Sequence, residues 1–221
     1  MHDVSSKDGK GWFYTETVKD HFFNPQNIVK TQEEAEKLSK EADGSGIEGS
    51  PACGDMMKMW IKVKDNKIVE CLWQTFGCAS AIASTSAFSV MIAENGGMEI
   101  EKALEIKPQD IANRLEGLPA RKFHCSVLAD KALRAAINDY YKKSNQLDKV
   151  KEDKIKMIDK ILKITDHDIE EAVLDGVRTF EGLQKRTKIG VQDKTCIPEA
   201  KQLLRYYVEK YFPDEISKLE L

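Results

Sequence analysis

Alternation of apolar and polar positions marks a pair of strands in the first half of the chain. Every second residue from Met57 to Val63 is apolar, and lysines and Trp60 occupy the positions between, which is the period of a half-buried strand. Asp65-Asn66 can turn the chain, and residues 67–76 (KIVECLWQTF) supply a returning strand. The pattern predicts an antiparallel hairpin.

Helical patterns flank this hairpin. Residues 15–23 predict a helix ended by Asn24-Pro25, because a residue before proline is pushed out of the helical region. Thr31 and Glu34 form a capping box that opens a polar helix over residues 31–42. Apolar stripes and breakers predict further helices over residues 78–93, near 98–105 and 108–116, and over 125–144.

Two segments carry little to bury. Residues 43–55 (DGSGIEGSPACGD) contain Gly44, Gly46, Gly49 and Gly54, and this composition predicts a flexible loop. Residues 142–154 are rich in charge, which is typical of a linker or a helical extension.

Beyond the charged stretch, residues 164–211 predict a compact helical unit. One helix starts at Thr165 or Asp166 and ends at Gly176, and Pro198 opens the last helix. We therefore expect a first domain over residues 1–144, a linker or extension over 145–156, and a small all-α module over 157–221. The fold class is α+β, a small antiparallel sheet packed with helices.

Composition narrows the class of protein. The chain has 221 residues, 41% hydrophobic and 32% charged, with a formal net charge of −3. These values are ordinary for a soluble globular protein and give no reason to expect nucleic acid or a membrane as a partner. The first residues lack the apolar core of a secretory signal. The five cysteines are odd in number and widely spaced, which favours reduced thiols in the cytoplasm.

Three of the cysteines stand beside features that favour a thiolate. Cys53 lies in the glycine-rich segment with Asp55 two residues on, and Cys78 and Cys125 stand at predicted helix starts, where the helix dipole lowers a thiol pKa. His124 directly precedes Cys125. Together these residues are a soft-ligand set suited to zinc, Cu(I) or an iron–sulfur cluster.

Spacing alone leaves other interpretations open. The chain has no C-x-x-C pair, so it does not match a structural zinc finger. Free cysteine is also commonly a small buried hydrophobic residue. This is the expected role of Cys71, which lies in the middle of a predicted strand.

Longer motifs connect the chain to a known family. The strings NPQNI, GSPACGDMMKMWIKV, TFGCASAIASTSAF and LPARKFHCSVLADKALRAAINDYY resemble, in order, the U-type iron–sulfur scaffold family of IscU and the NifU N-terminal domain. The resemblance runs from about Tyr14 to Tyr141. It implies that Cys53, Cys78 and Cys125 are cluster ligands, Asp55 the labile aspartate, and His124 the family histidine. Lys122 also falls on a family lysine.

The resemblance implies a function as well as a fold. Such a scaffold receives sulfur as a persulfide from a cysteine desulfurase, binds Fe²⁺, assembles a labile [2Fe-2S] cluster and transfers it to apo-proteins, without being an enzyme. We expect Asp55 to be the replaceable ligand, with the loop glycines letting it move aside. We expect Cys125 to accept sulfur first, as an exposed thiolate beside His124. The fourth resting ligand, Asp55 or His124, stays open.

The family also implies partners. We expect a homodimer, at least transiently. Members that use the dedicated Hsp70 chaperone carry LPPVK before the His-Cys pair, whereas residues 118–122 here read LPARK. Ala120 and Arg121 in place of proline and valine put chaperone docking in doubt.

The second half resembles the helical ferredoxin module that follows the scaffold domain in NifU proteins. That module binds a [2Fe-2S] cluster through C-x-C and C-x-x-C pairs. Here the first pair is replaced by Asp159 and Ile161, and the second pair reads Asp193 and Cys196. One thiolate cannot replace four, so we predict that this module binds no permanent cluster and serves for packing or docking.

Three other functions compete with the scaffold. The same Cys/Asp/His set can hold tetrahedral Zn²⁺, which makes a zinc-binding relative the main alternative. A regulatory relative without cluster traffic is another. A cysteine hydrolase is disfavoured, because neighbouring His124 and Cys125 side chains point apart more often than together.

Overall fold

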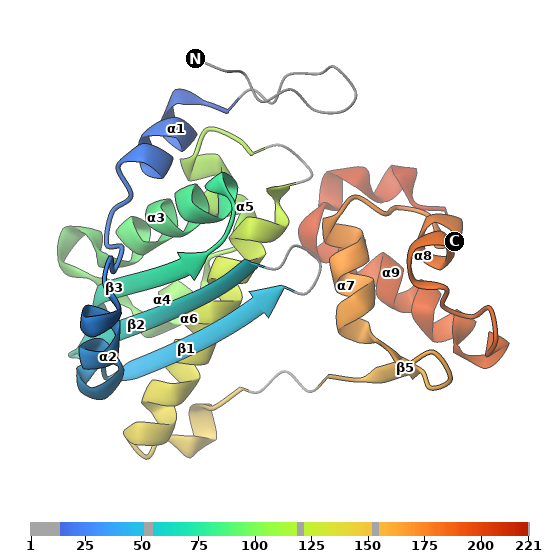
Figure 1. Cartoon of the computed structure of the whole chain (residues 1–221). Coiled ribbons are helices and arrows are strands. Elements are labelled where there is room, and N and C mark those ends of the chain that lie inside the picture. Colours follow the sequence, from blue (N-terminus) through green and yellow to red (C-terminus); the bar gives the residue numbers. More distant parts are fainter. Residues whose placement is uncertain (1–13, 51–54, 119–121, 152–154, 221) are drawn as a thin grey trace. The chain divides into compact units, whose positions relative to one another are not determined.

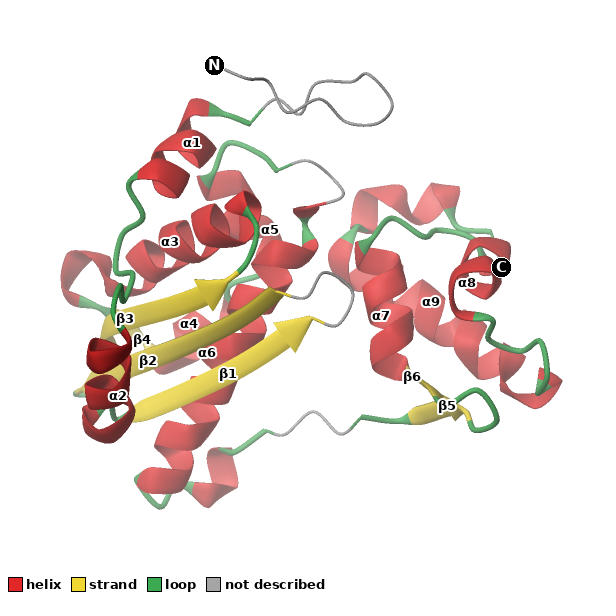
Figure 2. Ribbon diagram, in the orientation of Figure 1, coloured by secondary structure: helices red, strands yellow, loops and turns green. Residues whose placement is uncertain are grey.

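The chain folds into two compact units, each described by itself. The computed structural model describes residues 14–50, 55–118, 122–151 and 155–220 (Figures 1 and 2). Unit 1 comprises Met1–Glu152 and unit 2 comprises Asp153–Leu221.

Unit 1 contains an antiparallel sheet with strand order β1-β2-β3-β4 (Figure 2). The strands are β1 (Gly44–Ser50), β2 (Asp55–Lys64), β3 (Lys67–Phe76) and β4 (Met98–Glu99). Asp65 and Asn66, with φ of 51° and 61°, form the two-residue turn between β2 and β3. Positive φ at both turn residues matches the right-handed twist of the flanking strands. The predicted hairpin is confirmed.

The helices of unit 1 follow the predicted pattern closely. They are α1 (Glu16–Phe23), α2 (Gln32–Glu41), α3 (Ala79–Ala93), α4 (Ile100–Glu105), α5 (Pro108–Arg114) and α6 (His124–Lys143). The Thr31–Glu34 capping box is present at the start of α2. Within the described residues, no helix combines the length and apolar character that a membrane span requires.

The main core of unit 1 lies between the sheet and helices α3 and α6. Met57, Met59 and Ile61 of β2 are buried against residues of α3 and α6, including Phe88 and Leu133. The apolar alternation of β2 therefore faces the core, as the pattern predicts.

The opposite face of the sheet is less exposed than a half-buried strand predicts. Trp60 is only 1% exposed and packs with Val29, Ala35 and Ala42. Its ring N–H donates to Ser39 Oγ of α2 at 3.1 Å. Helix α2, which the sequence predicts as a polar helix, thus covers this tryptophan with its inner face.

The segment predicted as a flexible loop is largely a strand. Residues Gly44–Ser50 pair with β2 in regular antiparallel register. A Cβ atom at Gly46 would lie 2.3 Å from the Ala132 carbonyl oxygen of α6, and one at Gly44 would lie 2.2 Å from the Ala136 carbonyl oxygen. These two glycines let the strand lie directly on helix α6, so they are not hinges for a moving loop.

Unit 2 begins with a small antiparallel ladder of β5 (Met157–Asp159) and β6 (Ile164–Thr165). Helices α7 (Asp166–Leu174), α8 (Phe180–Thr187) and α9 (Ile197–Tyr211) follow. Thr165 caps α7 through its hydroxyl, and Gly176 has φ of +98° just after the helix, as the sequence predicts. Helix α8 and the short ladder were not predicted.

Candidate metal centre

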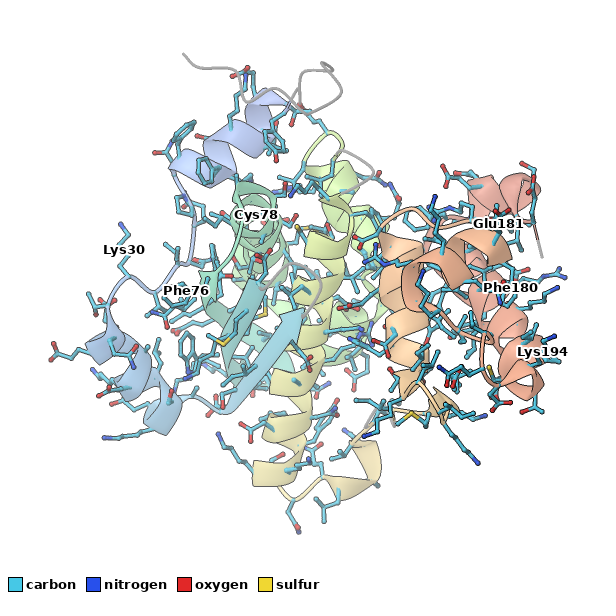
Figure 3. The ribbon with its side chains drawn as sticks, turned by 45° about the vertical axis from the view of Figure 1, so that its right-hand side comes forward. Lys30, Phe76, Cys78, Phe180, Glu181 and Lys194 are labelled. Atoms are coloured by element: carbon cyan, nitrogen blue, oxygen red, sulfur yellow. The ribbon has the colours of Figure 1, made fainter. Side chains whose placement is uncertain are left out.

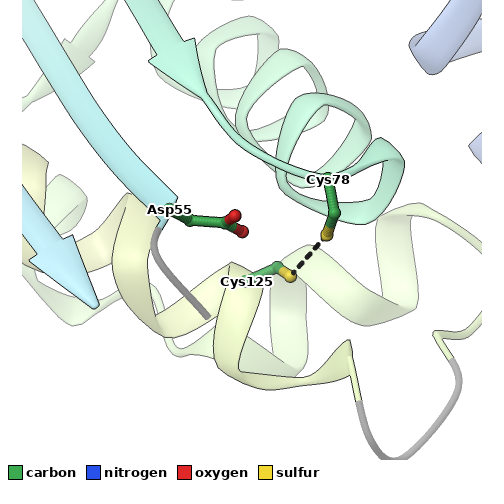
Figure 4. A group of neighbouring side chains, drawn as sticks. All are labelled: Asp55, Cys78 and Cys125. Carbon is green, nitrogen blue, oxygen red and sulfur yellow. Dashed lines mark hydrogen bonds between the residues drawn. The ribbon is translucent and has the colours of Figure 1, made fainter. Parts of the chain in front are cut away.

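Three predicted ligands meet at the ends of three separate elements of unit 1. Asp55 is the first residue of β2, Cys78 caps the start of α3, and Cys125 is the second residue of α6. Their ligand atoms all lie within 4.8 Å of one another (Figure 4). Residues distant in sequence therefore form one group of two sulfurs and a carboxylate.

A glycine allows the carboxylate to approach the sulfurs. Gly77 joins β3 to α3 directly before Cys78. A Cβ atom at this position would lie 3.3 Å from Asp55 Cγ and 3.0 Å from Ala81 Cβ. Any other residue at position 77 would crowd the Asp55 carboxylate, so the glycine fixes the shape of the centre.

The two sulfurs share a proton asymmetrically. Cys78 Sγ and Cys125 Sγ are 3.6 Å apart. The hydrogen bond from Cys125 lowers the pKa of Cys78 to about 5, with help from the Ala81 backbone N–H and Lys122 and against burial and Asp55. The same hydrogen bond and burial raise the pKa of Cys125 far above its ordinary value. In the ligand-free protein, Cys78 is the thiolate and Cys125 the thiol.

This finding corrects the stated reason for choosing Cys125 as the first sulfur acceptor. The sequence predicts that Cys125 is an exposed thiolate. In the structure, the side chain of Cys125 is fully buried and keeps its proton. The assignment itself stays a prediction.

A lysine completes the electrostatic environment. Lys122 Nζ lies 3.8 Å from Cys78 Sγ. Burial lowers the pKa of Lys122, but the electrostatic effects of Cys78, Cys125, Tyr14 and Asp55 together outweigh it and raise the pKa above its ordinary value. The ammonium and the thiolate therefore stabilise each other's charged forms.

The Asp55 carboxylate is incompletely satisfied. Its side chain is buried, with the residue 8% exposed, and its Oδ2 atom has no hydrogen-bond partner among the described residues. Buried polar atoms in proteins nearly always have a partner, so an exception indicates a functional role or a missing ligand. Here the orphan oxygen belongs to the group that includes both sulfurs.

Two predicted ligands cannot be placed. Cys53 lies outside the described residues, and so does the side chain of His124, although His124 begins α6. Their roles stay predictions. Cys71 is 1% exposed within the core, and burial raises its pKa to about 12. Its predicted packing role is confirmed.

Exposed apolar side chains stand beside the centre. Phe76, two residues before Cys78 at the end of β3, is 77% exposed (Figure 3). It pairs across the strands with Met56, which follows Asp55 and is 44% exposed. Sequence alternation did not single these two out, because both lie at strand ends.

Comparison with known proteins identifies the first unit. The NifU-like N terminal domain family matches residues 13–147, which is more than half of the chain. The chain belongs to the NifU N-terminal family. The resemblance found in the sequence motifs and the predicted α+β fold are both confirmed.

Three named relatives are similar to the first unit of this chain. The iron-sulfur cluster assembly scaffold protein IscU 1 of Archaeoglobus fulgidus is 48% identical over 139 residues, covering 63% of this chain and 84% of that protein. IscU of Escherichia coli is 45% identical over 131 residues, covering 59% and 95%. The nitrogen fixation protein NifU of Nostoc is 45% identical over 131 residues, covering 58% of this chain and 42% of NifU.

The second unit has its own match. The BFD-like [2Fe-2S] binding domain family matches residues 162–206. The NifU N-terminal family domain is thus followed by a BFD-like module, as the sequence resemblance predicts.

Proposed function

We propose that the chain is an iron–sulfur cluster assembly scaffold. It receives sulfur from a cysteine desulfurase, binds iron, and assembles a labile [2Fe-2S] cluster that it transfers to apo-proteins. The ligands are Cys53, Cys78 and Cys125, with Asp55 or His124 as the fourth. The scaffold names of its family relatives support this function, as does the donor chemistry of the site.

The main support is Asp55 Oδ2, a buried oxygen that lacks a hydrogen-bond partner in the part of the chain that the structure describes. Leaving a buried oxygen without a hydrogen bond costs about 1–3 kcal/mol, a cost that a bound cation removes. The neighbouring Cys78 thiolate adds a second negative charge, which iron also neutralises. A bound cation should therefore lower the free energy of this site relative to its ligand-free state.

The chemistry of the donors suits temporary binding. Thiolates bind iron strongly in clusters, whereas a carboxylate is a weaker match. An acceptor's thiol can displace Asp55 from iron while the sulfur ligands still hold the cluster. Cluster release then begins at the oxygen ligand. The cluster is cargo in this process, so the protein carries it without catalytic turnover.

Sulfur delivery places a specific demand on Cys125. As first acceptor, its thiolate attacks the outer sulfur of the desulfurase persulfide, forming a new S–S bond as the desulfurase thiolate leaves. Cys125 must first lose its thiol proton, which is hydrogen-bonded to Cys78. Cys78 is the rival acceptor, because it already holds the charge and is partly exposed.

Mass spectrometry after incubation with desulfurase and cysteine separates the two acceptors. A persulfide on Cys125 supports our assignment. A persulfide confined to Cys78 or Cys53 contradicts it.

Protein partners need a surface beside the site. Phe76 and Met56 offer exposed apolar contact next to the ligands. A desulfurase or an apo-acceptor that covers them would bring its own sulfur close to the centre. The homodimer and the chaperone stay predictions, and Pro119, Ala120 and Arg121 of the LPARK motif lie outside the described residues.

Zinc is the main alternative cargo, because two cysteines and a carboxylate also suit Zn²⁺. Visible absorption distinguishes the two, since a [2Fe-2S] cluster absorbs visible light and zinc does not. We expect anaerobic reconstitution with iron and sulfide to give a coloured protein with [2Fe-2S] Mössbauer parameters. The cluster should then appear in an added apo-ferredoxin. A colourless protein that retains only zinc would contradict the proposal.

A further inference from the structure

A second carboxylate–thiol pair lies at the centre of unit 2. Asp159, at the end of β5, is 0% exposed. Cys196, directly before α9, is also buried, and its sulfur lies 3.8 Å from Asp159 Oδ2. By the sequence resemblance, these two residues fall on one position from each of the cysteine pairs that hold a cluster in helical ferredoxin modules.

Backbone donors converge on this carboxylate. The N–H groups of Ile161 and Leu162 donate to Asp159 Oδ1 at 3.1 and 2.9 Å. The Gly190 N–H donates to Asp159 Oδ2 at 3.1 Å. One anionic side chain therefore connects the β5–β6 turn to the loop that follows α8. Convergent N–H groups of this kind form an anion-binding site.

Glycine is required where the second loop meets the carboxylate. Gly190 has φ of +71°, a conformation that other residues adopt rarely. A Cβ atom there would also lie 2.6 Å from Ile197 Cγ1. The positive φ of Gly190 and its close contact with Ile197 thus place the Gly190 N–H against the Asp159 carboxylate.

The residues present do not fit a [2Fe-2S] cluster. By the sequence resemblance, a module of this type holds its cluster through four thiolates, and of the four positions here only Cys196 is a cysteine. Ile161 is apolar and 57% exposed, and the Asp193 carboxylate accepts from Thr195 N–H and hydroxyl groups. The S–H group of Cys196 donates a hydrogen bond to the Asp193 carbonyl oxygen at 3.1 Å. Burial raises the pKa of Cys196, so this residue is a thiol rather than a thiolate.

We propose that the Asp159 carboxylate takes the place of the cluster in unit 2. It supplies the internal negative charge around which the two loops fold, and the module needs no iron. The Leu162 N–H and the other two backbone donors lower the pKa of Asp159 against the effect of burial, which agrees with a permanently charged group.

Hydrogen exchange of the full-length protein tests the organising role. In Asp159→Asn, the amides of Ile161, Leu162 and Gly190 should exchange at least about tenfold faster at neutral pH, because the charged acceptor is lost. The amides of β2 and β3 serve as an internal reference. Asp193→Asn is the matched control, since among the described residues the Asp193 carboxylate accepts hydrogen bonds only from the N–H and hydroxyl groups of Thr195. Unchanged exchange in Asp159→Asn would overturn the proposal.

Iron binding supplies an independent test that does not depend on the folding of a variant of Asp159. The variant C53S/C78S/C125S removes the proposed scaffold ligands and leaves unit 2 unaltered. After anaerobic incubation with iron and sulfide and gel filtration, we expect no visible absorption and no retained iron. Retention of a stoichiometric [2Fe-2S] cluster would show that unit 2 binds one, and the inference would fail.

Discussion

The two units each bury an aspartate beside a cysteine, but they use the carboxylates in opposite ways. In unit 1, Asp55 Oδ2 has no hydrogen-bond partner among the described residues and lies with the sulfurs of Cys78 and Cys125. In unit 2, both oxygens of Asp159 accept backbone N–H groups. One carboxylate is available to a ligand, and the other is already satisfied by the protein.

The sulfurs show the same contrast. Cys78 carries a lowered pKa because of Cys125 and nearby donors, and the positive charge of Lys122 supports it. Cys196 has a raised pKa because of burial and the charges of Asp159 and Asp193. The presence of Cys and Asp therefore does not define a metal site. In unit 1 the surroundings hold Cys78 as a thiolate and leave Asp55 Oδ2 without a partner among the described residues, whereas in unit 2 Cys196 keeps its proton and both oxygens of Asp159 are satisfied.

The largest expected effect is loss of the cargo when a sulfur of unit 1 is removed. Cys78→Ser should reduce reconstituted cluster content about tenfold or more, because serine is a poor ligand for iron in clusters. Iron, sulfide and visible absorption per chain provide the measurement. Cys196→Ala is the matched control, a buried cysteine of unit 2 that should leave cluster content unchanged. Equal losses of cluster in the two variants would contradict the proposal that only unit 1 binds the cluster.

Removing each carboxylate should change stability in opposite directions. In the ligand-free protein, Asp159→Ala leaves three backbone N–H groups without their acceptor and should lower the free energy of unfolding of unit 2 by about 2–3 kcal/mol. Asp55→Ala removes a buried oxygen that has no hydrogen-bond partner among the described residues, and it should raise the free energy of unfolding of unit 1 by about 1 kcal/mol. Urea unfolding followed by hydrogen exchange in each unit measures both. Changes of the same sign would refute the comparison.

Asp159 should make the stability of unit 2 depend on pH. Because the folded-state pKa of Asp159 is lowered, its stabilisation is fully present above the unfolded value of about 4 and is lost as the pH falls through the folded value. The free energy of unfolding of unit 2 should therefore fall as the pH drops below about 4. In Asp159→Asn it should depend less on pH over this range. Circular dichroism across pH 2–6 would detect it.

The Asp55→Ala substitution should change the rate of cluster transfer from the scaffold to an acceptor protein. With the replaceable oxygen ligand gone, the cluster should persist longer on the scaffold, and transfer to an apo-ferredoxin should slow. Asp159→Ala is the control and should transfer at the wild-type rate. Transfer by Asp55→Ala as fast as wild type would remove the proposed role of this aspartate.

The sequence predicted the parts of the molecule that depend on local patterns. The hairpin, the capping box of α2 and the helix starts at Cys78 and Cys125 follow from alternation, caps and breakers. The family motifs also brought Asp55 and both cysteines into one proposed site, and the structure places their ligand atoms together.

Features that depend on tertiary contacts were missed. Strand β1 was predicted as a loop, because four glycines conceal that Gly44 and Gly46 are needed for contact with α6. The proton position in the Cys78–Cys125 pair depends on burial and a 3.6 Å contact that no spacing reveals. Asp159 was seen only as a missing cysteine, since the backbone donors come from two separate loops.

The smallest expected effect concerns the charge beside Cys78. Alkylation of Cys78 by iodoacetamide should have a midpoint near pH 5, because only the thiolate reacts, and the rate should fall as the pH drops below this value. Lys122→Gln removes a favourable charge 3.8 Å from the sulfur and should raise the midpoint. For a charge interaction of roughly 0.6 kcal/mol, the rate at pH 5 should fall about twofold, with little change well above the midpoint. Lys188→Gln in unit 2 is the matched lysine control. If Lys122→Gln left the profile unchanged, the thiolate would depend on Cys125 and the Ala81 N–H alone, and the contrast with Cys196 would then rest on hydrogen bonding rather than on a nearby cation.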